Sequence, residues 1–166
     1  MLPNGIDSVE HPNEASESGI TIRCFTPIGT IPGMGRVEIE AKEFINLEAH
    51  DVHQFVVLRV TPSAEYAQPG NALISYEDVD KIVSAIDQLA GVNPASTKYK
   101  QIEVEFSLKP NFKIVVFNDA KGKLMFSVSA EQATAYFGDL HRMTDFRSLI
   151  LRAKSTIDQN RSHRQS

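Results

Sequence analysis

The strongest constraint on the fold of this chain is an alternating pattern in residues 101–129, QIEVEFSLKPNFKIVVFNDAKGKLMFSVS. Apolar residues take every second position at its start, as in a β-strand with one buried face. Two turn signals divide the segment, Pro110-Asn111 and the polar stretch 118–122 with its terminal glycine. The pattern predicts three antiparallel strands joined as a meander.

A second set of strands is predicted before this meander. Alternation in residues 20–25 and 36–41, and the apolar run 55–58, indicate three further strands. The Pro/Gly-rich segment 26–35 lacks the Gly-Lys-Ser/Thr pattern of a phosphate-binding loop, so we expect a connecting loop there. Cys24 lies on the apolar side of the first strand, and we expect it to be a small core residue.

Helical periodicity and capping residues predict two longer helices and one short one. The clearest, SYEDVDKIVSAIDQLA, has Ser75 as its expected N-cap and stops before Gly91. A capping signal predicts a short helix within residues 129–138, and the last helix is expected to begin near Thr144. This order of elements hints at a duplicated unit of strands followed by a helix.

Together these elements predict an α+β fold: an antiparallel sheet of about six strands in two meanders, with two longer helices and one short helix packed against it. At 166 residues, the chain is long enough for one domain with a proper core but short for two. We place this domain at residues 19–160. An acidic arm, residues 1–18, is expected to be disordered, and a polar tail, residues 161–166, is expected to fray.

Charge and cysteine content limit the classes of function. The 17 basic and 21 acidic residues give a net charge of −4, so no overall field attracts nucleic acid or anionic lipid. A single cysteine excludes an intrachain disulfide framework and a multi-cysteine metal site. Neither a membrane-spanning stretch nor a targeting segment is visible, so we expect a soluble protein, cytoplasmic by default, with no membrane partner.

One cluster contains the residue types of a metal site. Glu48, His50, Asp51 and His53 lie within six residues, and imidazole and carboxylate groups are common metal ligands. A metal would also require a bend in the chain and a ligand from elsewhere, and the alternative is an ordinary polar loop between strands. His50 and His53 are therefore candidate metal ligands, but the sequence identifies no cofactor.

Two groups of residues are candidates for an interaction surface. The first is the second apolar face of the meander, which a helix, the other meander or a partner must cover. Its members are Val115, Phe117 and Met125. The second group could meet an acidic partner, such as the chain's own acidic arm, or form a solvated helix face. Its members are Arg147, Arg152 and Lys154. The aromatic residues Tyr136 and Phe137 are not interleaved with these charges in a stacking pattern, which argues against a nucleic-acid partner.

The segments PGMGRVEIEA, YEDVDKIVSAID, FKIVVFND with KLMFSVS, and FRSLILRAKSTID resemble a group of small uncharacterised bacterial proteins. The resemblance covers about residues 32–158 and implies a single compact domain of unassigned function, without catalytic residues to transfer. Because the sequence contains no reactive motif, we expect a non-enzymatic binding or protein-interaction module that contacts a partner or a second copy through its sheet face. The alternative is a metal-dependent enzyme or metal-binding domain centred on His50 and His53.

Overall fold

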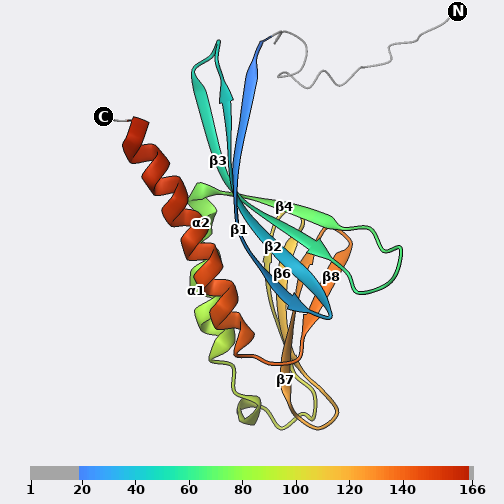
Figure 1. Ribbon diagram of the computed structural model, residues 1–166. Coiled ribbons are helices and arrows are strands. Elements are labelled where there is room, and N and C mark those ends of the chain that lie inside the picture. The colour runs from blue at the N-terminus through green and yellow to red at the C-terminus, as the bar shows by residue number, and fades with distance from the viewer. Residues whose placement is uncertain (1–18, 165–166) are drawn as a thin grey trace, which may run out of the picture.

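The computed structural model describes residues 19–164, which form eight strands and two α-helices (Figure 1). The first half contains β1 (Thr21–Gly33), β2 (Gly35–Asn46), β3 (Asp51–Thr61), β4 (Gly70–Ser75), the 3-10 turn η1 (Tyr76–Asp78) and α1 (Val79–Ala90). The second contains the 3-10 turn η2 (Pro94–Ser96), β5 (Glu103–Leu108), β6 (Phe112–Asn118), β7 (Leu124–Ala130), β8 (Ala133–Phe137) and α2 (Arg142–Arg164). The expected acidic arm, residues 1–18, lies outside the described residues, and so do residues 165–166 of the expected tail.

The α+β class and the antiparallel pairing are confirmed, but the prediction of about six strands in one sheet is wrong. The strands form two separate four-stranded meanders, ordered β1-β2-β3-β4 and β5-β6-β7-β8. The expected short helix within residues 129–138 is also wrong, because these residues form the end of β7 and all of β8. Ala133, Ala135 and Phe137 alternate into the core, so burial with period two outweighs the local capping signal.

The Pro/Gly-rich segment 26–35 is not a connecting loop. β1 continues through it to Gly33, Met34 makes the turn, and β2 begins at Gly35 with a φ of 89°. A Cβ on Gly35 would lie 2.4 Å from the carbonyl oxygen of Thr61, so both the backbone angle and the space require glycine. The expectation that Cys24 is a core residue is also wrong, because residues 21–27 of β1 are exposed on both faces.

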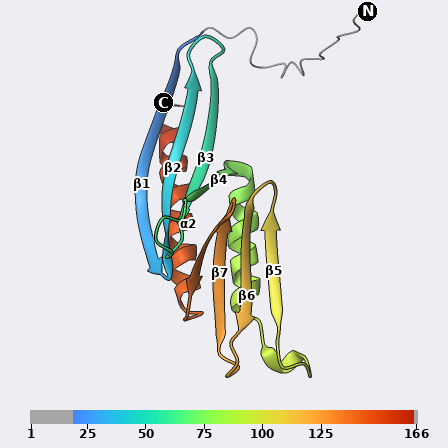
Figure 2. The same cartoon turned by 90° about the vertical axis from the view of Figure 1, so that its right-hand side faces the viewer.

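Each helix covers the sheet built by the other half of the chain. Figure 2 shows α2 behind the first sheet and α1 behind the second. α1 begins at Val79 rather than after Ser75, whose hydroxyl donates to the carboxylate of Asp78 instead of capping the backbone. A continuous apolar core joins both helices to both sheets, and its helical members are Val79, Ile82, Ile86, Leu89, Met143, Phe146, Ile150, Ala153 and Ile157. The other face of each sheet points away from the helices.

The two sheets are joined where the β1–β2 turn meets β8. The backbone amides of Met34 and Tyr136 each donate to the other residue's carbonyl oxygen, at 2.8 and 2.9 Å. Nearby, Gly70 of β4 lies directly against the backbone of Ala130 in β7. Among the described residues, no helix combines the length and apolar character needed to cross a membrane.

Candidate functional site on the second sheet

The face of the second sheet that points away from α1 carries side chains in regular rows, and we call it the open face. Strand register places Glu105, Val115, Ser127 and Tyr136 in its central row. The rows on either side contain Ser107, Lys113, Ser129 and Thr134, and Glu103, Phe117 and Met125. Alternation along each strand sends the intervening residues into the core, so this face is separate from the packing that holds the fold together.

Differences in side-chain size along these rows create a hollow of about 580 Å³. Its floor is formed by Val115, Ser127 and Ser129, which are only 7%, 6% and 5% exposed. The rings of Phe117 and Tyr136 flank the floor with centroids 6.2 Å apart and planes at 86°. Because serine is short and the rings are large, the floor lies below the rings. The volume is within the usual range of ligand pockets, about 300–1,000 Å³.

The hollow combines its aromatic rings with hydroxyls and with charges of both signs. Ser129 and Thr134 share a hydrogen bond of 2.8 Å between their hydroxyl oxygens, in which either group can be the donor. Lys113 and Glu103 line the hollow. Lys113 also approaches Glu105, which lies outside the lining, to 3.7 Å, and the side chains of Lys113 and Glu105 are about half exposed. Exposed pairs of this kind contribute about 0–1 kcal/mol, so a ligand in the hollow can recruit Lys113 from this pair at small cost. These groups can stack against a ligand and hydrogen-bond to it.

Hydrogen bonds to the backbone fix two sides of the hollow. Its β8 side is held by the backbone pairing of Tyr136 with Met34, which ties the chain that carries the aromatic ring to the first sheet. On the β5 side, the Asn118 side chain accepts from the backbone amide of Ile102 and donates to the carbonyl of Lys100, at 3.0 and 2.8 Å. These bonds hold the chain entering β5 against the end of β6. The rim is therefore set by the fold before a ligand arrives.

The structure brings the apolar interaction candidates together. Val115, Phe117 and Met125 all lie on the open face, and Phe117 is the cross-strand neighbour of Met125. Val115 is nearly buried, whereas the other two are partly exposed. Neither helix covers this face, so the expectation that a partner covers it remains a prediction.

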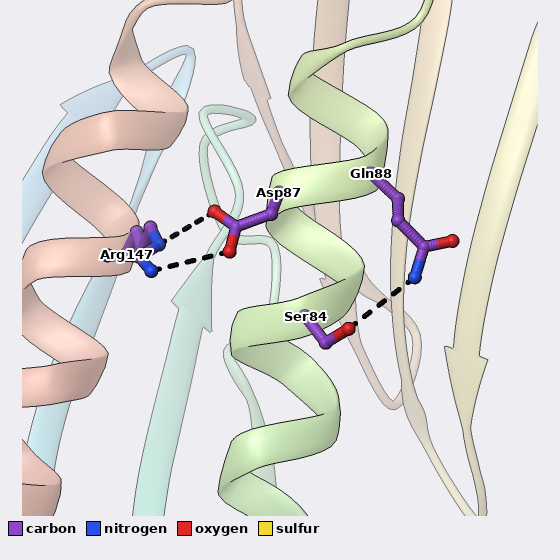
Figure 3. Close-up of polar contacts among 4 residues, drawn as sticks. All are labelled: Ser84, Asp87, Gln88 and Arg147. Atoms are coloured by element: carbon purple, nitrogen blue, oxygen red, sulfur yellow. Dashed lines mark hydrogen bonds and ion pairs between the residues drawn. The ribbon is translucent and has the colours of Figure 1, made fainter.

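The basic candidates lie on α2, and two of them contact α1. Arg147 binds both carboxylate oxygens of Asp87, with distances of 2.8 and 3.3 Å (Figure 3). On the other side of α1, Gln88 donates to the Ser84 hydroxyl at 3.5 Å.

Lys154 donates to Asp80 at 2.9 Å, and this hydrogen bond raises the pKa of its ammonium group. Arg152 is exposed on α2. Arg147 and Lys154 therefore link the two helices, which leaves Arg152 as the most accessible of the three basic candidates.

The candidate metal ligands lie at and beside the β2–β3 turn. His50 is in the turn with a φ of 56°, and His53 is in β3 opposite Phe44. The described part of the chain contains no group of three or more histidine, cysteine, aspartate or glutamate residues able to hold a metal ion. The metal hypothesis stays a prediction.

Of the residues that line the hollow, sequence reasoning named only Val115 and Phe117 as candidates. Those it missed on β7 and β8 are Ser127, Ser129, Thr134 and Tyr136. They were missed because β8 was expected to be helical, which left β7 without its neighbour. The alternation in ATAYF was the available signal. Comparisons with protein-family models, curated proteins and solved structures find no match to this chain.

Proposed function

We propose that this protein is a non-enzymatic binding module that holds its ligand in the hollow of the open face. The observation that carries the proposal is an aromatic wall around a floor of short side chains. Tyr136 remains 43% exposed beside a floor that is almost fully buried. Aromatic side chains at the rim of a preformed hollow are the groups that most often dominate binding energy.

The proposed ligand is a segment of a protein. One aromatic or branched side chain of the partner would fill the space above Ser127, and the partner's backbone would reach the hydroxyls of Ser129 and Thr134. Lys113 and Glu103 lie on different strands around the hollow, and a mixed pair of charges favours a polypeptide over a polyanion. A second copy of the chain is one possible source of such a segment.

Native mass spectrometry of the purified full chain tests this proposal. Ser127→Leu fills the floor, and Ser107→Leu makes the same change on the open face at a residue that does not line the hollow. We expect a bound polypeptide or a dimer for the wild type and for Ser107→Leu, and the bare chain mass for Ser127→Leu. Thermal unfolding checks that both variants fold.

The proposal is wrong if all three proteins give only the bare chain mass, or if the same complex persists in Ser127→Leu. The same spectra address the alternative function. A bound metal mass that is lost in His50→Ala and His53→Ala would support the metal-binding hypothesis instead.

A further inference from the structure

The face of the first sheet that points away from α2 carries positive charge among aromatic rings. The register of β1, β2 and β3 places Arg23, Phe44 and His53 in one row. The next row on this face contains Phe25, Lys42 and Phe55. We call these six residues the basic–aromatic patch.

Contacts within the patch organise its cations around one ring. The Arg23 guanidinium lies 6.0 Å from the centre of the Phe44 ring, and the Lys42 ammonium lies 5.5 Å from it. Phe44 also meets Phe55 edge to face, with ring centres 5.6 Å apart. Phe25 is 62% exposed. The rows on either side of the patch contain Asp51 and Glu40 on the same face. The ion pairs within 4.0 Å among the described residues nevertheless include neither Arg23 nor Lys42.

The chain itself supplies a segment of complementary charge next to this patch. Residues 1–18 contain no lysine and no arginine, but they contain four carboxylates: Asp7, Glu10, Glu14 and Glu17. The described chain begins with Gly19 and Ile20, and the carbonyl of Ile20 accepts from the amide of Leu47 at 3.1 Å, at the same end of these three strands. The acidic segment is therefore attached beside the patch.

The tether is long enough for the segment to turn back onto the patch. Arg23 follows Ile20 by three residues, which is about 10 Å along a strand. Eight residues lie between Glu10 and Gly19, and the nine steps along the chain span up to about 30 Å when extended. A short tether also gives an effective concentration in the millimolar range, so weak charge contacts suffice.

We infer that residues 1–18 dock on the basic–aromatic patch, with their carboxylates against Arg23 and Lys42. The other face of the same strands offers Ile22, Ile45 and Val52, an apolar row without charge that suits an acidic segment poorly. The patch is therefore occupied by the chain's own acidic segment at low salt, and a polyanion must displace that segment to bind.

Paramagnetic relaxation in the full chain tests this inference. Cys24→Ser removes the native thiol, and Ser8→Cys places a nitroxide label in the acidic segment. The rings of Phe25, Phe44 and Phe55 report on the patch, while the methyl groups of Ile22, Ile45 and Val52 report on the opposite face of the same strands. We expect the ring signals to lose more intensity than the methyl signals. The contrast should shrink in 1 M salt, where the screening length is about 3 Å.

Two full-length variants provide the controls. Arg23→Glu with Lys42→Glu should remove the contrast, and Arg152→Glu, an exposed charge change on α2, should preserve it. Equal broadening of rings and methyls, or stronger broadening of the methyls, would overturn the inference. A second measurement compares the affinity of a single-stranded oligonucleotide for the wild type with its affinity for a variant in which the four carboxylates of residues 1–18 are changed to amides. We expect tighter binding to the variant. Equal affinities would also overturn the inference, because the segment would then not occupy the patch.

Discussion

Replacing Gly70 with alanine should loosen the contact between the two sheets. A Cβ at this position would lie 2.0 Å from the carbonyl oxygen of Ala130, whereas real Cβ atoms essentially never approach another heavy atom closer than 3.0 Å. The two backbones must therefore separate by at least 1.0 Å, the difference between these distances. The adjacent residue, Asn71, is held by Asn111 and Glu131 of the second sheet, so β4 cannot shift without straining these bonds.

Forcing extra atoms into a packed contact costs about 1–3 kcal/mol. For a chain of this size, 1 kcal/mol lowers Tm by roughly 2–4 °C. We therefore expect Gly70→Ala to lower Tm by about 2–12 °C in thermal unfolding followed by circular dichroism.

Gly138→Ala is the matched control. It has no atom within 4 Å of the new Cβ and no left-handed backbone angle. A compatible Gly→Ala change stabilises by about 0.4–1 kcal/mol, because it reduces the entropy of the unfolded chain. If Gly70→Ala is as stable as Gly138→Ala, the close contact between the sheets is not as described.

Three further predictions concern the core and the helix contacts. Phe126→Ala should lower the free energy of unfolding by about 3–5 kcal/mol in denaturant titration, because Phe126 is fully buried and stacked on Phe137; a loss below 1 kcal/mol would refute this. A double-mutant cycle on Asp87 and Arg147 should give a coupling of about 0.2–1 kcal/mol that falls with added salt, and zero coupling at low salt would argue against the pair. The hydrogen bond to Asp158 raises the pKa of Tyr76, so its contribution to stability is present below the unfolded pKa and is lost as pH rises through the folded value. Tyr76→Phe should therefore destabilise the fold at pH 8 and progressively less above pH 10, and a pH-independent difference would contradict that origin.

Strands whose alternation was long and bounded by turn residues could be predicted from the sequence. The segment 101–129 does form β5, β6 and β7. The two missed strands, β4 and β8, are short and contain small residues, so their pairing depends on neighbours that sequence periodicity does not reveal. At β8, the expected capping sequence is instead a tight turn in which Glu131 adopts a φ of 54°. The pairing of β8 with β7 therefore outweighs the local helix signal in residues 129–138.

The candidate site could be predicted only in part, for a related reason. Alternation identifies Val115 and Phe117 as members of one face, because this depends only on their own strand. The floor and the second wall require Ser127 and Tyr136 to lie beside them, and that depends on the register of β6 with β7 and of β7 with β8. Which face each helix covers is likewise a property of the whole chain, since each helix packs on the sheet of the other half.

The most direct test of the binding surface is an NMR titration of the ¹⁵N-labelled chain with phenol, which stands in for an aromatic side chain of a partner. Saturable shifts are predicted at the backbone amides of Val115, Ser127 and Ser129, absent in Ser127→Leu and retained in Ser107→Leu. Shifts spread evenly over both sheets, or unchanged by Ser127→Leu, would contradict the claim that this hollow is the binding surface.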